Sequence, residues 1–192
     1  MACGKGRHLK WFGQAGMEIF GSDLSEQSIQ EAGSNIPSAD LKVHDMRNPI
    51  PFTGMDLTVN LFTSLGYFDS AGDDRKIIRN AYDSLRSGGY FVLDYMNTEH
   101  IGSSIVPKNE QTIGDVIFRI SREMKDGVVR KTIMVEDQEE KYQFVEQVRA
   151  YGKDDLVKMI SESGFQDIEV FGKDMAESVN DSERVVILAR KP

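Results

Sequence analysis

Short apolar runs alternate with helical patterns through the first half of the chain. Four runs predict strands, at residues 17–21, 41–43, 56–60 and 90–94. Ser25 caps a predicted helix that runs toward Gly33. A second predicted helix begins at Asp73 or Asp74, and the glycine pair 88–89 ends it. This alternation predicts an α/β fold built on a parallel sheet.

Residues 112–150 change to a period of two, which is typical of half-exposed strands. Val116, Phe118 and Ile120 alternate with polar residues, and residues 125–128 carry a hairpin-turn signal. We therefore expect an insertion of three antiparallel strands, which would serve as a substrate cap. Beyond it the chain predicts three more elements, a helix at 153–163 and strands at 168–171 and 185–188.

Composition narrows the classes of function. The chain holds 23 Lys and Arg against 31 Asp and Glu, a net charge of −8, and residues 112–150 hold seven basic against eight acidic residues. An acidic surface repels a phosphate backbone, so we expect a small-molecule substrate and no nucleic acid. No apolar run is long enough to span a bilayer, and the single cysteine fits a reducing cytoplasm.

Candidate chemistry lies at the predicted strand ends, where open α/β sheets bind ligands. The loop 2–8 carries Gly4 and Gly6, which would let the backbone approach a ligand closely. Leu9 stands where a dinucleotide motif needs its third glycine, which argues against a nicotinamide oxidoreductase. Asp23 could bind ribose hydroxyls or simply cap a helix, and Asp45 could bind an adenine amine or form a turn.

Together these stretches resemble class I S-adenosylmethionine-dependent methyltransferases. Residues 2–8 (ACGKGRH) look like the glycine-rich motif, residues 21–25 (GSDLS) are similar to the acidic motif, and residues 45–47 (DMR) match the adenine motif. Residues 85–91 (LRSGGYF) resemble the stretch before the fifth strand of the family. The resemblance covers the whole chain, 1–192, as one Rossmann-like methyltransferase domain with helices on both faces of its sheet.

The resemblance implies the roles of individual residues toward S-adenosylmethionine, which becomes S-adenosylhomocysteine after transfer. The expected cofactor-binding residues are Ala2, Cys3, Gly4 and Gly6 for the methionine part, Asp23 for the ribose, Leu24, Asp45 and Met46 for the adenine, and Asn60 beside the methionine part. No metal is expected.

The methyl acceptor is predicted less sharply. Residues 60–63 (NLFT) depart from the motif of methyltransferases that act on nucleic-acid amines, so a small molecule with a nitrogen, oxygen or carbon nucleophile is expected. Tyr67, Arg149 and Tyr151 are candidate substrate contacts, although each could equally be a packed aromatic or a surface cation. The alternative is a non-catalytic protein of the same fold that binds the cofactor weakly. The sequence leaves monomer and homodimer open.

The family places its first strand in the middle of the sheet, in the order 3-2-1-4-5-7-6, and this sequence opens at the loop that follows that strand. We therefore expect a slot between the strands at 17–22 and 56–61. Three explanations stay open at this stage: a segment that lies outside the sequence, a different chain start, and strand exchange with another chain.

Overall fold

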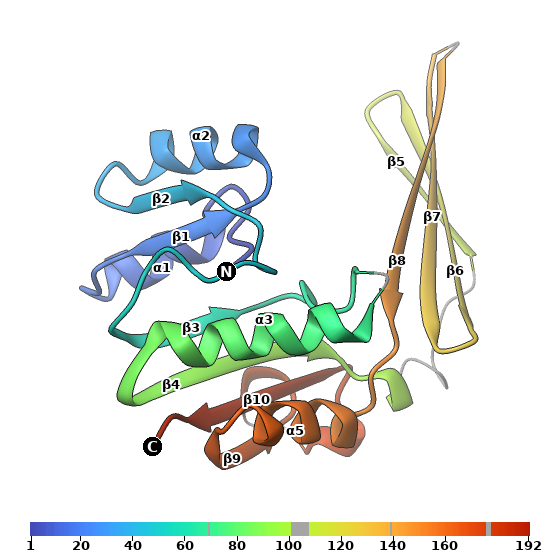
Figure 1. Cartoon of the computed structure of the whole chain (residues 1–192). Coiled ribbons are helices and arrows are strands. Elements are labelled where there is room, and N and C mark those ends of the chain that lie inside the picture. The colour runs from blue at the N-terminus through green and yellow to red at the C-terminus, as the bar shows by residue number, and fades with distance from the viewer. Residues whose placement is uncertain (69, 101–107, 139, 176–177) are drawn as a thin grey trace.

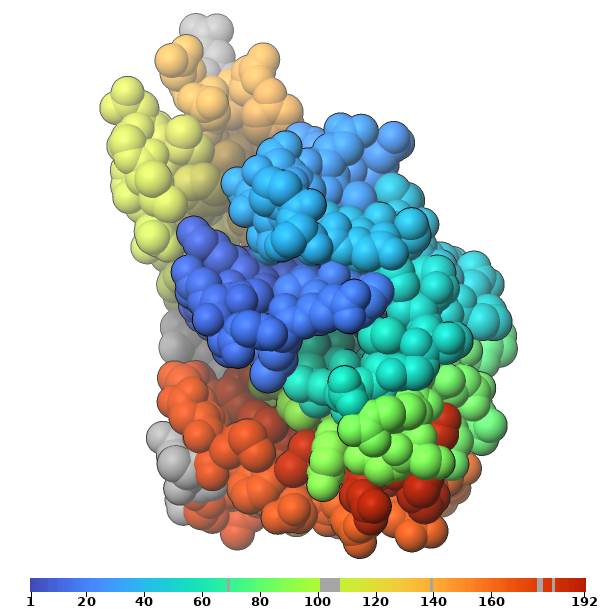
Figure 2. Space-filling view, turned by 90° about the vertical axis from the view of Figure 1, so that its left-hand side faces the viewer, coloured from blue at the N-terminus to red at the C-terminus, as the bar shows by residue number. Residues whose placement is uncertain are grey.

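The computed structural model describes residues 1–68, 70–100, 108–138, 140–175 and 178–192. Three sheets organise the chain (Figure 1). Their strand orders are β1-β2, β3-β4-β10-β9 and β5-β6-β7-β8. The space-filling view shows the blue N-terminal segments lying above the green and red elements of the four-stranded sheet (Figure 2). None of the helices in the described ranges is long and apolar enough to cross a membrane.

The N-terminal layer contains four elements, α1 (Arg7–Gln14), β1 (Phe20–Asp23), α2 (Glu26–Asn35) and β2 (Asp40–Val43). The predicted cap is confirmed, because the Ser25 hydroxyl accepts a hydrogen bond from the Ser28 amide at 3.2 Å. β1 and β2 are parallel. Leu9, Ile19 and Ile36 form the small core of this layer.

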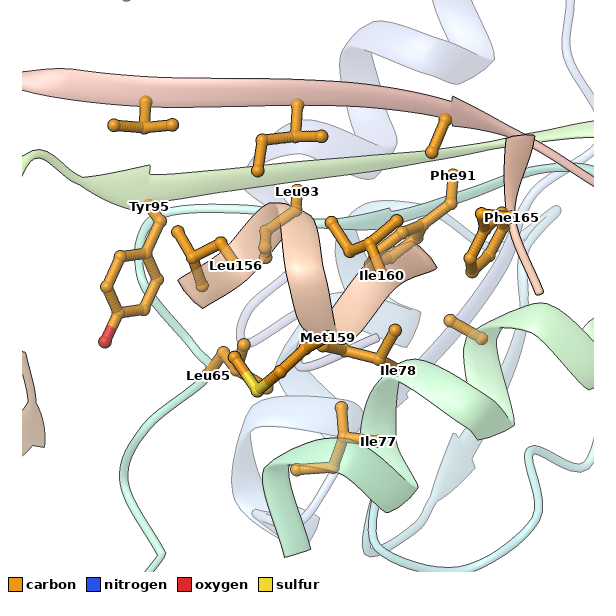
Figure 3. Close-up of a cluster of buried hydrophobic side chains, with 14 of the residues drawn as sticks. Leu65, Ile77, Ile78, Phe91, Leu93, Tyr95, Leu156, Met159, Ile160 and Phe165 are labelled. Atoms are coloured by element: carbon orange, nitrogen blue, oxygen red, sulfur yellow. The ribbon is translucent and has the colours of Figure 1, made fainter. Parts of the chain in front are cut away.

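The second layer contains the main core. Its elements are β3 (Met55–Asn60), α3 (Ala71–Ser84), β4 (Leu85–Met96), α5 (Lys153–Glu162), β9 (Gln166–Phe171), the 3-10 helices η1 (Lys173–Met175) and η2 (Val179–Asp181), and β10 (Arg184–Arg190). Apolar residues of α3 and α5 meet the buried side of β4 (Figure 3). Ile77, Ile160 and Leu93 in this cluster are fully buried. Burial of such side chains stabilises the fold by about 1.5–3 kcal/mol each.

Two expectations about this layer were wrong in detail. The second helix ends at Ser84, so the glycine pair 88–89 lies inside β4 instead of ending the helix. A Cβ atom on Gly89 would lie 2.9 Å from the Met55 carbonyl oxygen, so close strand approach explains that glycine. The sheet is also not wholly parallel, because β10 pairs antiparallel with both β4 and β9.

The insertion has four strands, where the sequence predicted three. They are β5 (Lys108–Ile113), β6 (Val116–Lys125), β7 (Val128–Asp137) and β8 (Glu140–Arg149). The sequence pattern missed β5 because all six of its residues are exposed and five of them are polar. The predicted turn is confirmed at Asp126 and Gly127, which both adopt positive φ angles between β6 and β7.

The expected slot is present between β1 and β3. Among the described residues β1 pairs only with β2, and on that side of the second sheet β3 pairs only with β4. A cavity of about 510 Å³ is lined by residues of both strands. The strands β2, β1, β3, β4, β10 and β9 therefore follow the order 3-2-4-5-7-6, with the cavity at the position of the family's first strand.

Candidate cofactor and acceptor site

Hydrogen bonds bring the predicted loop and strand ends to one edge of the molecule. The Cys3 amide donates to the Ser22 carbonyl oxygen in β1 at 2.9 Å, and the Met1 nitrogen donates to the Val59 carbonyl oxygen in β3 at 3.0 Å. The Asn60 side-chain amide lies 3.9 Å from the Met46 sulfur. These contacts join the glycine-rich loop to the ends of β1, β2 and β3.

The glycines of the loop serve different purposes. Gly4 and Gly6 have positive φ angles of 52° and 81°, which side chains disfavour. A Cβ on Gly6 would lie 3.0 Å from the Ile36 Cδ1 atom and 3.1 Å from the Ala32 Cβ atom, so Gly6 lets α1 start tightly against α2. A Cβ atom on Gly4 would have no described neighbour within 4 Å. Gly4 therefore leaves its backbone accessible to a ligand.

Asp23 holds the loop in place. One carboxylate oxygen accepts a hydrogen bond from the Gly4 amide at 2.8 Å, and the other accepts one from the Ser25 amide at 2.9 Å. Asp23 therefore also orders the start of α2, which is the alternative role that the sequence suggested. The exposed side chain of Leu24 follows immediately, with 67% of its surface accessible.

Asp45 forms an ion pair with its neighbour. The Arg47 guanidinium contacts both carboxylate oxygens, with Nε 3.0 Å from each, and its carbon lies 4.6 Å from the Phe68 ring centroid. Hydrogen bonds from Arg47 lower the pKa of Asp45 to about 2. Asp45 is therefore a carboxylate at neutral pH, and it already has a cationic partner in this structure.

Asn60 and Met46, two of the predicted cofactor-binding residues, lie close together, at the end of β3 and in the loop after β2. The Met46 carbonyl oxygen accepts a hydrogen bond from the Asn80 side chain at 3.0 Å, which fixes the loop after β2. Asn60 is 1% exposed, and its Oδ1 atom has no hydrogen-bond partner within the described ranges. Such buried acceptors are rare, and a donor from a ligand or a water molecule would satisfy this one.

A cavity of about 260 Å³ follows the loop. Its lining comes from residues 1–5, 7–9, 12, 59, 61, 62 and 64. His8 is one of these residues, and its buried Nε2 atom has no partner in the part of the chain that the structure describes. Burial lowers the pKa of His8, so the ring is neutral at pH 7, and its Nε2 atom is a donor or an acceptor according to the tautomer. The chemistry of this cavity fits the polar end of an amino-acid-like ligand.

A second cavity of about 630 Å³ lies between the core and the base of the insertion. Charged residues from both parts line it, namely Arg122, Lys131, Glu146, Glu183 and Arg184. Tyr67 lines it as well, and burial together with the Glu146 carboxylate raises the pKa of this phenol. Tyr67 is therefore a neutral hydrogen-bond donor beside the charged groups.

Phe62 lines both cavities. Its φ angle is 58° and that of Thr63 is 59°, a conformation that costs energy for side chains of this size. Asp94 holds the turn, because its carboxylate accepts a hydrogen bond from the Phe62 amide at 2.9 Å. Arg184 forms an ion pair with Asp94, in which the arginine Nη2 atom lies 2.7 Å from the carboxylate Oδ1 atom. The ring of Phe62 therefore lies at the junction of the two cavities. It stacks on the His8 ring, with the two ring centroids 4.9 Å apart.

Arg149 and Tyr151, the other predicted substrate contacts, are instead tied to a buried carboxylate. The Tyr151 hydroxyl donates to Asp74 at 2.7 Å, and the Arg149 Nε atom lies 3.7 Å from the same carboxylate. Asp74 is fully buried and also accepts the Gly66 amide at 2.9 Å. This network positions the loop that carries Tyr67.

Known proteins share this fold and part of the sequence. A family model described as a methyltransferase domain matches residues 1–93. A structure of an S-adenosylmethionine-dependent methyltransferase from Clostridium acetobutylicum superposes with a TM-score of 0.86 at 21% identity, over 99% of this chain and 81% of that one. These matches support a class I S-adenosylmethionine-dependent methyltransferase.

Two further matches within this family are informative. An amino pentose methyltransferase from Micromonospora echinaspora, solved with S-adenosylmethionine bound, superposes with a TM-score of 0.79 at 18% identity, over all of this chain and 81% of that one. A dTDP-3-amino-3,4,6-trideoxy-α-D-glucopyranose N,N-dimethyltransferase from Streptomyces venezuelae is 25% identical over 133 residues, 66% of this chain. The match spans about half of that relative's length, 54%.

Sequence reasoning missed several residues of this candidate site. Asp94 and Arg184 come from separate segments, and only the pairing of β4 with β10 brings them together. Asn80 and Asp74 lie on α3, where polar residues are expected on the exposed face of a helix. A signal was available for Asp74, because it stands in the first turn of a helix whose other buried residues, apart from Ser84, are apolar.

Proposed function

We propose that this chain transfers the methyl group of S-adenosylmethionine to an amine nitrogen of a small, sugar-like molecule. The observation that carries the proposal is the junction at Phe62, where a cavity beside the glycine-rich loop meets a larger, charged cavity under the insertion. Methyl transfer needs donor and acceptor in line, and two adjoining cavities provide such an arrangement.

The cofactor would extend along the strand ends. Gly4 and the unpartnered Asn60 Oδ1 atom would hold its methionine part, with Ala2, Cys3 and Gly6 shaping the loop. Asp23 would hold the ribose, and the adenine would lie among Leu24, Asp45 and Met46. Because the Arg47 guanidinium covers both Asp45 oxygens, it would have to release one of them for an adenine amine.

When bound, the cofactor supplies an already activated methyl group, so this chain's own residues need mainly to position the acceptor and exclude water. The ring of Phe62 would separate the two ligands except at the point of transfer. Glu146 and Tyr67 would orient a cationic or neutral amine. An amine attacks only as the free base, and a nearby carboxylate can take up its proton.

The charged residues of the larger cavity support an acceptor molecule that carries both a positive and a negative group. Glu146 and Glu183 suit an amine, whereas Arg122, Lys131 and Arg184 suit an anionic group such as a phosphate. The Streptomyces relative is named for an amino sugar attached to a nucleoside diphosphate, which carries both groups. The amino-sugar acceptor therefore rests on this charge pattern together with that relative.

A homodimer is proposed for the assembly. One face of the insertion carries an apolar stretch, with residues Ile113, Val116, Phe118, Ile120, Ile133, Val135, Tyr142 and Phe144 aligned by the strand register, while Arg122, Lys131 and Glu146 on the same face line the larger cavity. The opposite face carries ion pairs such as Arg119 with Glu136. Three strands of ten residues and one of six, at ~3.4 Å per residue and ~4.8 Å per strand, give roughly 590 Å² per copy, so two copies would bury at most roughly 1,200 Å².

The proposal is tested by binding and turnover together. Calorimetric titration with S-adenosylhomocysteine should show micromolar affinity, and a labelled-methyl assay over amino-sugar nucleotides and their hydroxyl analogues should label only the amines. Phe62→Ala should lower turnover at least tenfold with little loss of cofactor affinity. Labelled hydroxyl analogues would overturn the amine assignment.

The slot between β1 and β3 favours a second candidate, a protein of this fold that binds the cofactor weakly and does no chemistry. Loop 1–6 reaches both layers through only a few hydrogen bonds, so its position depends on how firmly β1 and β3 are held. Absence of binding at millimolar cofactor would favour this candidate over the enzyme.

A further inference from the structure

The insertion presents a row of three charged side chains to the larger cavity. Arg122 on β6 lies opposite Lys131 on β7, and Lys131 lies opposite Glu146 on β8. All three residues line the cavity. Like charges that lie directly opposite each other on two strands are unfavourable, and one carboxylate cannot balance two cations. The row therefore keeps one uncompensated positive charge.

Most other ionic groups of this cavity have an opposite charge beside them. The Lys131 ammonium lies 3.1 Å from the Glu146 carboxylate, and the Glu183 carboxylate lies 3.3 Å from the lysine that begins η1. Arg184 forms its ion pair with Asp94. These groups compensate one another before any ligand arrives.

Arg122 differs from them. Its Nη1 atom donates to the Asn109 side-chain oxygen at 2.7 Å, and this partner is neutral. The ion pairs of β6 within the described ranges belong to Arg119 and Glu123, which lie on the opposite face of the strand. A guanidinium has five N–H donors, so Arg122 keeps donors and an uncompensated charge for a ligand. Asn109 lines the same cavity and offers its amide nitrogen as a further donor.

A phosphoryl group suits these donors better than a carboxylate. The planar guanidinium binds two phosphate oxygens through parallel N–H bonds, and Lys131 adds a second charge beside it. When Glu146 turns toward an acceptor amine, Lys131 loses its partner and two cations face the ligand. A phosphate that carries about two negative charges compensates both, whereas a carboxylate compensates one.

The row also sets the direction of the acceptor. β7 lies between β6 and β8, so strands ~4.8 Å apart place the backbone at Arg122 and Glu146 roughly 10 Å from each other (Figure 1). Tyr67 lies toward the β8 end, because the carbonyl oxygen of its neighbour Gly66 accepts a hydrogen bond from the Arg149 amide at 2.8 Å. An acceptor whose amine lies beside Glu146 and Tyr67 must extend across the sheet to reach Arg122. A phosphate attached to a sugar ring provides this extension.

We propose that Arg122 is a specificity-determining residue, which selects an acceptor with a phosphoryl group at the β6 end of the row and its amine at the β8 end. The inference rests on the proposed function for the amine end alone. It narrows the anion-binding cations of the cavity to Arg122 and its neighbour Lys131, and it leaves Arg184 to hold the turn at Phe62.

Binding tests the phosphoryl subsite without methyl transfer. The ligands are glucose 1-phosphate and a nucleoside diphosphate glucose, which both lack an amine. In calorimetric titrations Arg122→Gln should weaken the affinity for both ligands by about tenfold or more, because it removes charged hydrogen bonds. Arg122→Lys keeps the charge but loses the planar fork, so it should recover part of the affinity.

Arg119→Gln is the matched control for Arg122→Gln. It removes the same charge from the same strand, but on the opposite face, where Arg119 pairs with Glu110 and Glu136. This variant should bind both phosphorylated ligands as the wild type does. A melting curve of each variant separates lost binding from lost folding.

Turnover distinguishes this inference from the proposed function. With a labelled cofactor, Arg122→Gln should raise KM about tenfold for a phosphorylated amino sugar, with little change in kcat, and should leave KM for the unphosphorylated amino sugar unchanged. If no amine is methylated while Arg122→Gln still weakens binding of the phosphorylated sugars, the proposed function fails and the subsite stands. Equal affinities of the wild type and Arg122→Gln for both phosphorylated sugars would overturn the subsite, whether or not amines are methylated.

Discussion

The Tyr151 hydroxyl donates a hydrogen bond to the Asp74 carboxylate at 2.7 Å, and this bond joins the segment after the insertion to helix α3. Asp74 is fully buried, and desolvation raises its pKa, although the bonds from Tyr151 and Gly66 oppose the increase. Burial and the same bond raise the pKa of the Tyr151 phenol. The phenol therefore keeps its proton at neutral pH, and its bond to Asp74 holds the two segments together.

Tyr151→Phe should lower the free energy of unfolding by about 1–3 kcal/mol, because it leaves a buried carboxylate oxygen without its donor. Denaturant unfolding monitored by circular dichroism measures this loss. Tyr90→Phe is the matched control, since Tyr90 is exposed on β4, and it should change stability by less than about 0.5 kcal/mol. Equal effects would contradict the role of Asp74.

Most secondary elements could be predicted because local patterns determine them. The cap at Ser25 and the turn at Asp126 and Gly127 depend on short-range hydrogen bonds and φ angles, and both are present. The end of α3 and the strand β5 could not be predicted in the same way. β5 is held by its pairing with β6 alone, and no apolar pattern in its own six residues records that pairing.

Arg47→Ala should raise the pKa of Asp45 from about 2 toward its ordinary value of 3.8. The depressed pKa means that the pair's contribution to stability is present above pH 3.8 and is lost as pH falls through about 2. The difference in stability between wild type and Arg47→Ala should therefore shrink over that interval. Carboxyl-detected NMR titration checks the pKa, and Lys42→Ala, which removes the partner of Asp40, should leave it unchanged.

Asp23→Ala should lower affinity for S-adenosylhomocysteine at least tenfold. The change removes both the expected ribose contact and the acceptor that holds the Gly4 amide at 2.8 Å. Calorimetric titration gives the affinity, and a melting curve separates lost binding from lost folding. Asp40→Ala, at the exposed start of β2, is the control that should bind normally. Unchanged affinity in Asp23→Ala would place the ribose elsewhere.

The site was predictable where one segment supplies a whole motif, and less so where segments must meet. The loop 2–8, Asp23, Asp45 and Asn60 could be proposed because each follows a recognisable strand pattern, and hydrogen bonds do bring these segments together. Their cofactor roles stay predictions. The junction at Phe62 could not be foreseen, because the strained turn there depends on Asp94, which is thirty-two residues away in sequence.

Phe144→Asp should convert the proposed dimer to a monomer, whereas Val145→Asp should leave it intact. The two residues are neighbours in β8 with similar exposures of 56% and 48%, but the strand places them on opposite faces of the sheet. Phe144 aligns with Ile133 and Ile120 on the apolar face, and a charge buried there between two copies would be strongly unfavourable. Light scattering after size-exclusion chromatography measures the mass of each variant. A monomeric wild type, or a dimer that Val145→Asp disrupts and Phe144→Asp does not, would show that this face does not join the copies.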